Sequence, residues 1–307
     1  MLNSITFQQN LKKICSDFLE RKFLLAVSGG VDSMVLLELF QLTDLRFEVA
    51  HINYHFREED SNLDRMLVED YCTKNQIQFH LKDVSEEEKS RMKSLQNWAR
   101  NMRYEFFFDI LNKENLDYVV TAHHLNDELE TFLINLSRGS GIKGLSGIPK
   151  DENQILRPLL DFTKDEFYTF AKEYNVNFRE DKSNEKDDYL RNKIRNQLSP
   201  KIFEIFPNFL TQFREGLNHL NTVNQFYQDE IEKSFQEVLI LENQDTLTLD
   251  KEKLLKKPKT LIIEIIRKLG FSGLEIEKII HSENGKFFRS SSHEISIKRQ
   301  EIICKRR

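Results

Sequence analysis

The sequence predicts an α/β protein, with a parallel sheet that carries helices on both faces and a smaller, mainly helical C-terminal domain. Two observations predict this class. Through the first 160 residues, short apolar runs alternate with stretches of helical periodicity, as in a parallel sheet joined by crossover helices. Beyond Pro200 and Pro207 the apolar residues recur mostly at helical spacing. We therefore expect one domain over residues 1–205 and a second over residues 206–307.

Five short apolar segments bounded by turn residues are the candidate strands. They are Phe23–Val27, Arg46–Ile52, Ile77–Val84, Tyr118–Thr121 and Ile155–Leu156. Helical periodicity marks Met34–Leu42, Glu59–Asn75, Ser94–Asn112, Asp127–Leu136 and Lys164–Tyr174. Parallel sheets bind ligands beyond the carboxyl ends of their strands. Polar groups at Ser28, at His51 to His55, and at His123 with His124 follow three such ends, so we expect one site where they meet.

The C-terminal domain is expected to begin with a long helix and to end in a small β element. The helix carries an apolar stripe, which is typical of packing rather than of a ligand site, and Pro207 suits its first turn. The stripe consists of Phe206, Phe209, Leu210, Phe213, Leu217, Leu220, Val223 and Tyr227. Near the end of the chain, Glu294–Lys298 and Glu301–Lys305 alternate as strands do.

The charge is distributed unevenly along the chain. The whole sequence has a net charge of −5, but residues 251–307 contain fifteen Lys and Arg against seven Asp and Glu. This segment is therefore +8, and the first 250 residues are −13. Such asymmetry favours a basic surface that contacts a polyanion; the alternative is an ordinary solvated basic face.

Composition excludes other classes of protein. The chain is 39% hydrophobic and 31% charged, as globular proteins are. It has neither an apolar run of roughly 18 residues, which could span a bilayer, nor a signal-peptide segment. The three cysteines, Cys15, Cys72 and Cys304, form no Cys-x-x-Cys pair. We expect a cytoplasmic protein that uses neither a membrane nor thiol chemistry.

The most informative motif is SGGVDS, which joins the first candidate strand to the helix after it. A helix N-terminus presents unpaired N–H groups and the positive end of its dipole, so it favours phosphate. Glycines let the backbone approach an anion, and a carboxylate beside phosphates indicates a cation such as Mg²⁺. The lysine of a P-loop is absent. The candidate phosphate-binding residues are Ser28, Gly29, Gly30, Val31, Asp32 and Ser33; a plain Ser-Gly turn is the alternative.

The second motif is AHHLNDELET. On a helix that starts near Asn126 as its N-cap, Asp127 and Glu130 share one face. The alternative is a capped helix with acids on its surface. The preceding His123 and His124 do not have the spacing of a closed zinc site, and no cysteine lies nearby.

A glycine-rich run follows this predicted helix. Gly139–Gly144 spells Gly-x-Gly-x-x-Gly, the fingerprint of dinucleotide-binding folds. That fingerprint requires a strand before it, and here a helix precedes it. A nicotinamide or flavin site is therefore rejected.

Together these motifs resemble those of the tRNA(Ile)-lysidine synthases, a family of the N-type ATP pyrophosphatases. SGGVDS alone marks the superfamily, whereas the combination is specific to the family. The likeness covers about residues 20–200 and includes, in order, SGGVDS, AHHLNDELET, RGSGIKGLSG, RPLL, EDKSN and YLRNKIR. The resemblance implies a PP-loop domain of Rossmann-like layering, with ATP and Mg²⁺ as cofactors and a tRNA-binding C-terminal domain.

The resemblance also implies a reaction. The C2 oxygen of the wobble cytidine in the CAU anticodon of tRNA(Ile) attacks the α-phosphate of ATP and releases pyrophosphate. The ε-amino group of free L-lysine then displaces AMP and leaves lysidine. The partners would be L-lysine and tRNA(Ile), and the sequence leaves the oligomeric state open, a homodimer included.

The acids of the two motifs suit that chemistry. Developing charge on pyrophosphate needs Mg²⁺, for which we expect Asp32 and Asp127. The lysine ammonium needs carboxylates, for which we expect Asp127 and Glu130, one of which could act as the base. The candidate catalytic residues are Asp32, Asp127, Glu130 and Arg103.

Further residues are assigned by matching the family pattern. Asn53, at the end of the second strand, and His123 join the ATP-binding set. Arg100 and Arg103 match an Ala-Arg-x-x-Arg-Tyr pattern and are expected on phosphate or on the lysine carboxylate, with a charged helix face as the alternative. On the segment from Tyr189 to Arg195, three basic residues form a patch that is expected to bind anticodon-loop phosphates. They are Arg191, Lys193 and Arg195.

Three other functions fit part of the pattern. A tRNA 2-thiolation enzyme would share the loop, but those enzymes typically use paired cysteines. A small-molecule amide ligase of the NAD or GMP synthetase type would not use the basic segments. A non-catalytic tRNA-binding module would leave Asp32, Asp127 and Glu130 idle. Some family members carry a further C-terminal domain, for which this chain is expected to be too short.

Overall fold

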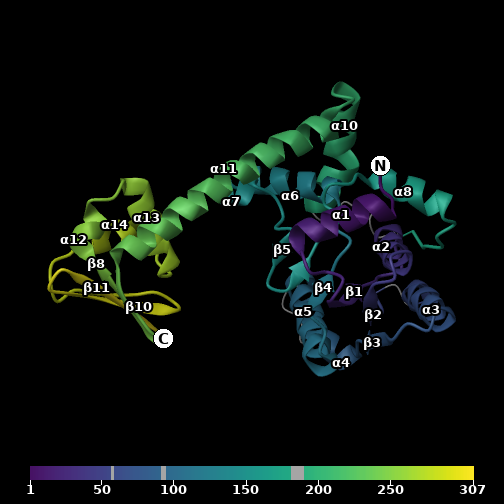
Figure 1. The fold of residues 1–307 in the computed structure, drawn as a ribbon, viewed down its shortest axis with the longest axis horizontal. Coiled ribbons are helices and arrows are strands. Elements are labelled where there is room, and N and C mark those ends of the chain that lie inside the picture. Colours follow the sequence, from purple (N-terminus) through teal and green to yellow (C-terminus); the bar gives the residue numbers. More distant parts are fainter. Residues whose placement is uncertain (57–58, 91–94, 181–189) are drawn as a thin grey trace. The chain divides into compact units, whose positions relative to one another are not determined.

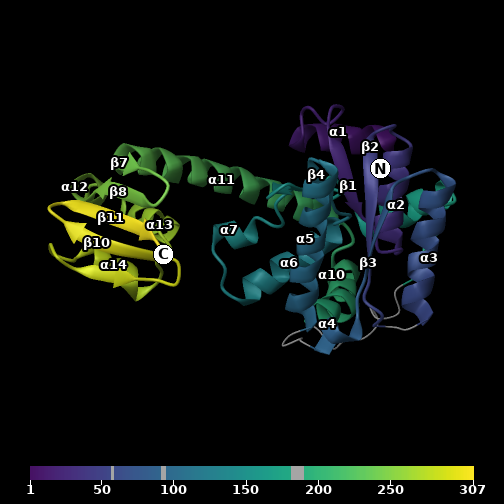
Figure 2. The same ribbon diagram turned by 90° about the horizontal axis from the view of Figure 1, so that it is seen from below.

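The computed structural model describes residues 1–56, 59–90, 95–180 and 190–307. It divides into two compact units, Met1–Asn218 and His219–Arg307 (Figures 1 and 2). Helix α11, Phe209–Val238, contributes residues to both units, and the predicted domain boundary after residue 205 stays a prediction. The predicted loop at 181–188 lies outside the described residues. Within the described part of the chain, no helix is long and apolar enough to cross a membrane.

Unit 1 contains a six-stranded sheet in the order β3-β2-β1-β4-β6-β5. Its strands are β1 (Lys22–Ala26), β2 (Arg46–Asn53), β3 (Phe79–Asp83), β4 (Tyr118–Val120), β5 (Asp151–Glu152) and β6 (Ile155–Leu156). All neighbouring pairs are parallel except β5 with β6. In register, Leu25 of β1 lies opposite Val49 of β2 and Val120 of β4. The α/β class with a mainly parallel sheet is confirmed.

Helices cover both faces of this sheet (Figures 1 and 2). Adjacent residues of β1 show why, because Leu25 packs in one core cluster with α2 and α3, and Leu24 packs in another with α5. Both side chains are fully buried, which explains the continuous apolar run that marks this strand in the sequence. The larger helices of the unit are α1 (Ser4–Ile14), α2 (Val31–Gln41), α3 (Glu59–Lys74), α5 (Leu95–Glu114), α6 (Leu125–Ser137) and α8 (Lys164–Glu173).

Short helical segments complete the unit. They are α4 (Glu86–Ser90), α7 (Ile142–Leu145), α9 (Leu190–Lys193), the π-helical η2 (Ile194–Leu198) and α10 (Ser199–Ile205). Sequence periodicity did not predict α1, which begins at a capping box: the Asn3 side chain accepts from the Thr6 N–H, and the Thr6 hydroxyl accepts from the Asn3 N–H. The buried Phe7 and Leu11 of α1 join the core on the α2 face.

Unit 2 corrects the prediction of a mainly helical C-terminal domain. It is built on a five-stranded antiparallel sheet in the order β7-β8-β11-β10-β9. The strands are β7 (Leu239–Glu242), β8 (Thr246–Asp250), β9 (Phe287–Arg289), β10 (His293–Lys298) and β11 (Glu301–Arg306). The last two coincide with the two predicted strands, whereas β7, β8 and β9 were not predicted. β8 reads Thr-Leu-Thr-Leu, an alternation that sequence analysis missed.

Three helices and the end of α11 pack with this sheet. The helices are α12 (Lys251–Leu255), α13 (Lys259–Lys268) and α14 (Leu274–Ile280). Ile265 of α13, Ile295 of β10 and Phe235 of α11 belong to one buried cluster. The apolar stripe predicted along the long helix is only partly buried: Leu217 is buried, whereas Val223 is 54% exposed. The helix begins at Phe209, two residues after Pro207.

Candidate active site

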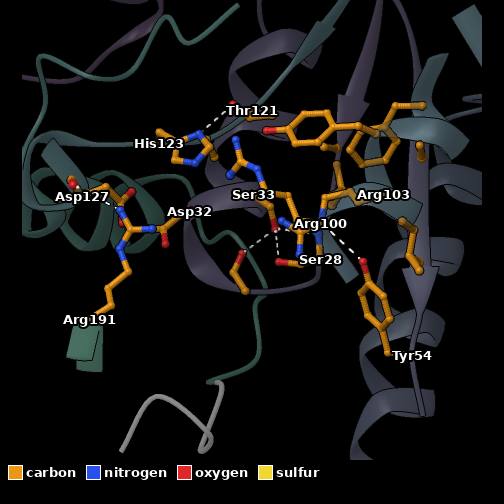
Figure 3. Close-up of a pocket in the computed structure, with 18 residues that line it drawn as sticks. Ser28, Asp32, Ser33, Tyr54, Arg100, Arg103, Thr121, His123, Asp127 and Arg191 are labelled. Atoms are coloured by element: carbon orange, nitrogen blue, oxygen red, sulfur yellow. Dashed lines mark hydrogen bonds between the residues drawn. The ribbon is translucent and has the colours of Figure 1, made fainter. Parts of the chain in front are cut away.

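A pocket of about 420 Å³ opens at the carboxyl ends of β1, β2 and β4 (Figure 3). Its volume is in the range of ligand-binding clefts. Nine of the residues assigned from the sequence line it: Ser28, Gly30, Asp32, Ser33, Arg100, Arg103, His123, Asp127 and Arg191. The convergence expected from the strand ends therefore occurs at one place in unit 1.

The phosphate-loop candidate is ordered by its own hydrogen bonds. Gly30 is the N-cap of α2, and Ser33 Oγ donates to the Gly30 carbonyl at 3.0 Å. The Ser28 N–H donates to the same hydroxyl at 3.1 Å, and the two serine Oγ atoms lie 3.2 Å apart. Gly29 has φ +94°, and a Cβ there would lie 3.2 Å from the Asp64 carbonyl oxygen. Only glycine fits such a conformation and such a close approach.

Asp32 projects from the first turn of α2 toward the pocket (Figure 3). The ammonium of Lys164 donates to both its carboxylate oxygens, at 2.7 and 2.8 Å. Burial raises the pKa of Asp32, but His124 and Lys164 outweigh that effect, and the net pKa is lowered. Sequence analysis missed Lys164 because it lies 132 residues from its partner. Its position at the first residue of α8 was the only local signal.

His124, rather than Asn126, is the N-cap of α6. Its Nδ1 accepts from the Asp127 N–H at 3.3 Å, and the Asp127 carboxylate accepts from the His124 N–H at 3.1 Å. Its Nε2 lies 3.7 Å from Asp32. Burial lowers the pKa of His124, but Asp127 and Asp32 outweigh it, and the net pKa is raised. The imidazole therefore links the two acids expected to hold Mg²⁺.

Glu130 is bound by two arginines from the segment after α8. Arg191 Nε donates to Oε2 at 2.8 Å, and Arg195 Nε donates to Oε1 at 2.6 Å. Arg195 also reaches the Asp127 carboxylate, at 3.2 Å. The Glu130 side chain is only 2% exposed, whereas the arginines are 42% and 35% exposed. The structure thus places two candidate tRNA-binding residues on the candidate lysine-binding acids.

The third member of the basic patch lies apart from these contacts. Lys193 is exposed and does not line the pocket. Tyr189 and the EDKSN residues from Asp181 onward lie outside the described residues.

The wall opposite the acids is aromatic and basic (Figure 3). Arg103 Nε donates to the Tyr54 hydroxyl at 3.4 Å, and that hydroxyl donates to the Ala99 carbonyl at 3.1 Å. The Arg100 guanidinium lies 5.1 Å from the centre of the Tyr104 ring. This wall presents flat rings and cations, which suit a base and a phosphate. Sequence analysis identified the arginines but not the tyrosines.

His123 and Asn53 occupy different positions. His123 lines the pocket, its Nδ1 lies 2.8 Å from Thr121 Oγ1, and burial lowers its pKa to about 4. It is therefore neutral at pH 7. Asn53 is buried; its amide donates to Asn62 and its carbonyl oxygen accepts from the His55 N–H. Its side chain holds the end of β2 and does not line the pocket.

The glycine-rich run follows α6, in agreement with the rejected dinucleotide context. The backbone just after this run is held by Glu128, a buried carboxylate that accepts from the Ile148 N–H at 2.7 Å. Burial raises the pKa of Glu128 to about 7. Gly147 has φ +85°, and a Cβ there would lie 2.4 Å from the Glu128 carboxylate. Sequence analysis missed this anchor, because an acid beside Asp127 resembles an ordinary first-turn residue.

Two carboxylates that line the pocket, Asp32 and Asp127, have the oxygen donors that Mg²⁺ prefers. The described residues include no group of three or more His, Cys, Asp or Glu arranged as a metal site. Asp32 and Asp127 supply hard oxygen ligands on either side of His124. Mg²⁺ usually takes one or two carboxylates and completes its shell with phosphates and water. The two acids therefore fit Mg²⁺ bound together with a nucleotide.

Comparison with known proteins defines the class first. Residues 3–202 match the family model of the PP-loop domain, and residues 242–307 match that of the TilS substrate binding domain. Unit 1, with its loop at the amino end of α2, is therefore a PP-loop domain. The chain is 35% identical to a tRNA(Ile)-lysidine synthase of Petrotoga mobilis, over 70% of each chain. It belongs to the tRNA(Ile)-lysidine synthase family.

Other similar proteins include longer relatives and a solved structure of similar fold. The chain is 35% identical to the tRNA(Ile)-lysidine synthase of Bacteroides thetaiotaomicron over 88% of its own length, and it spans 64% of that relative. For the Porphyromonas gingivalis enzyme the identity is 32% and the spanned share 63%. The fold is also similar to a U34-tRNA thiolase, NcsA of Methanococcus maripaludis with its [4Fe-4S] cluster. That match has a TM-score of 0.57 at 15% identity and covers 71% of this chain and 78% of the thiolase.

Proposed function

We propose that this protein ligates L-lysine to the wobble cytidine of the CAU anticodon of tRNA(Ile), using ATP. The observation that carries the proposal is the pocket at the strand ends, where the phosphate loop, two acids and a basic aromatic wall meet. Membership of the family supports the same reaction. The three cysteines are unpaired and buried, which suits work in the reducing cytoplasm.

The first step needs a leaving pyrophosphate and an exposed α-phosphate. The loop Gly30–Ser33 contains the backbone N–H groups at the start of α2. A helix N-terminus points such groups toward a bound phosphate. Lys164 lies beside the loop on Asp32 and can contact a triphosphate oxygen when that acid turns to Mg²⁺. The cytidine O2 attacks the α-phosphorus, the bond to the bridging oxygen breaks, and pyrophosphate leaves. Bound Mg²⁺, held by Asp32 and Asp127, would neutralise charge on the leaving group.

The second step needs a lysine amine close to the adenylated C2. The lowered pKa of Asp127, on which burial is outweighed by His124 and the neighbouring cations, keeps this carboxylate ionised and able to bind an ammonium group. Glu130 reaches the same ammonium only if the Arg191 and Arg195 guanidinium groups move or share its oxygens. After the ammonium loses a proton, the amine attacks C2 and AMP departs with the former O2. Asp127 is the better placed base, because it lines the pocket.

The tRNA would be held by basic residues outside the pocket. Lys193 is exposed beside the pocket-lining Arg191, and unit 2 supplies exposed cations such as Lys298 and Lys305 on its sheet. Contacts of this kind bind phosphates and weaken as salt rises.

The proposal is tested by incubating the protein with ATP, radiolabelled lysine and tRNA(Ile) that carries the CAU anticodon. We expect label in the tRNA, with AMP and pyrophosphate formed in equal amounts. Elongator methionine tRNA, which shares that anticodon, is the control. Absence of label, or equal labelling of the two tRNAs, would refute the proposal.

The lysine assignment has its own test. Asp127→Asn should raise the KM for lysine and lower kcat, because Asp127 is proposed both to bind the lysine ammonium and to act as the base. Glu130→Gln should weaken lysine binding while the KM for ATP stays the same. Equal losses for lysine and ATP in the Glu130 variant would exclude it as a lysine ligand and leave it a purely structural anchor.

A further inference from the structure

The phosphate loop is held from outside the pocket by Arg179. The backbone N–H of this residue donates to the Gly29 carbonyl at 3.0 Å. Its guanidinium reaches α3 instead: Nε donates to Asp64 at 2.8 Å, and one Nη donates to Asp60 at 2.7 Å. One residue therefore fixes the Gly29 peptide and binds two acids of a neighbouring helix.

The other side of the same peptide is closed by α3. A Cβ on Gly29 would meet the carbonyl oxygen, Cα and Cβ of Asp64 at 3.2 to 3.4 Å. The Asp64 side chain is 12% exposed, so its charge is largely withdrawn from water. Gly29 thus lies between the Asp64 backbone and the Arg179 N–H. The guanidinium–carboxylate contacts join these two walls to each other.

The same contacts place a cation beside two acids that lie near the loop. Asp60 and Asp64 lie behind a loop that would receive the negative charge of a triphosphate, and acids near an anion site weaken binding unless a cation offsets them. Arg179 supplies that cation, and the planar fork of its guanidinium contacts both carboxylates at once. It does not line the pocket.

We propose that Arg179 is a positioning residue for ATP binding, which acts by fixing the Gly29 peptide of the phosphate loop against Asp60 and Asp64. This inference rests on the proposed function only in assuming ATP as the ligand. Without its side-chain contacts, Arg179 is no longer anchored to α3, and the loop must be ordered as ATP binds. The positive charge that contacts Asp60 and Asp64 behind the loop is also lost. Both effects weaken ATP binding equally in the ground state and in the transition state, so they raise the KM for ATP and leave kcat nearly unchanged.

The matched control is Arg65 of α3. Its side chain is 33% exposed, as that of Arg179 is, and it also contacts two acids, Glu69 at 3.2 Å and Asp83 at 3.5 Å. Neither of those acids packs on Gly29. Arg65→Ala therefore removes an equivalent exposed guanidinium without touching the loop.

The experiment measures ATP affinity by calorimetry, without lysine or tRNA, and then KM and kcat in the ligation assay. We expect Arg179→Ala to weaken ATP binding about tenfold and raise the KM for ATP equally, with kcat within about twofold of wild type. Arg65→Ala should change neither. Arg179→Lys keeps the charge but not the fork, so it should weaken ATP binding about threefold. Amide exchange over residues 28–31 without ATP should be faster in both Arg179 variants.

Two results would overturn the inference, and they differ from failure of the proposed function. The positioning role would be refuted if Arg179→Ala and Arg65→Ala bind ATP equally well. It would also be refuted if Arg179→Ala lowers kcat at unchanged KM. If Arg179→Ala does not fold, Arg179→Lys decides: an ATP affinity and loop exchange equal to wild type would refute the tether. Wild-type protein that binds ATP but does not label tRNA would refute the proposed ligation and leave this inference standing.

Discussion

The two units differ in the burial of charged side chains: unit 1 buries several of them, and unit 2 buries none. Among the described residues of unit 1, several ionisable groups are buried: His51, Asp64, His124, Glu128, Glu130 and Arg157. In unit 2, all of whose residues the structure describes, the buried polar side chains are Ser234 and Thr248, and no charged one is buried. Its ion pairs, such as Glu232 with Lys268, lie at the surface.

The difference teaches where chemistry is concentrated. Withdrawing a charge from water is costly unless partners compensate it, so such groups are retained mainly where they act or hold something that acts. In unit 1 they surround the pocket and the loop. In unit 2 the charges stay in water, where they can attract a polyanion over a broad surface without distorting the core. The contrast agrees with the proposal that unit 1 carries the reaction and that unit 2 contacts tRNA.

The strongest test of this contrast is Lys164→Ala. A charge-assisted contact is worth about 1.5–3 kcal/mol, so we expect kcat/KM for ATP to fall between about 10- and 150-fold. Lys257→Ala in unit 2 is the control, because that ammonium is similarly covered and also contacts a carboxylate, Glu237. Steady-state kinetics of pyrophosphate release measures both. Equal, small effects would show that the contact between Lys164 and Asp32 has no catalytic role.

Glu130→Gln measures the structural side of the contrast. A neutral amide would leave two guanidinium groups without their carboxylate, and we expect unit 1 to lose about 2 kcal/mol of unfolding free energy. This is less than for a fully buried pair, because both arginines are partly exposed. Glu232→Gln in unit 2 should cost less than about 0.5 kcal/mol. Amide exchange, followed separately over α6 and over α13, distinguishes the units. A larger loss from Glu232→Gln would reverse the comparison.

The smallest expected effect concerns the sheet of unit 2. If Lys305 contacts a phosphate of tRNA, Lys305→Gln should reduce the slope of log affinity against log salt by about one. Lys22→Gln, an exposed lysine at the amino end of β1 and away from the pocket, should leave the slope unchanged. Filter binding between low and moderate salt gives both slopes. If the tRNA affinity of the unsubstituted protein does not change with salt, unit 2 does not bind a polyanion through phosphate contacts.

Most elements of unit 1 could be predicted from the sequence, because the patterns that mark them are local. A strand buried on both faces gives a continuous apolar run, as Phe23–Val27 does, and the glycines after it mark the turn where α2 begins. The convergence of Ser28, His123 and Asp127 then follows from parallel topology alone. The polar residues of the phosphate loop and of the start of α6 could therefore be predicted from the sequence.

What could not be predicted depends on long-range pairs. Asp32 with Lys164, Asp64 with Arg179 and Glu130 with Arg191 are 132, 115 and 61 residues apart. No periodicity records such contacts, so Arg191 was read as part of an exposed basic patch rather than as a partner of Glu130. In the antiparallel sheet of unit 2, β10 and β11 were predicted, whereas β7 was missed for a different reason. Helix α11 runs directly into β7 at Leu239, and the short strand has no turn residues to separate it.

The buried thiols have a practical consequence. Cys15, Cys72 and Cys304 are all buried, and burial raises the pKa of each, to about 11 for Cys15 and Cys304 and about 12 for Cys72. The thiolate is the form that attacks a maleimide, so we expect thiols in this state to react slowly. A single cysteine introduced at an exposed position, such as Leu274 at 79% exposure, would then carry a fluorophore selectively. The protein can be labelled for single-molecule spectroscopy without first removing a native residue.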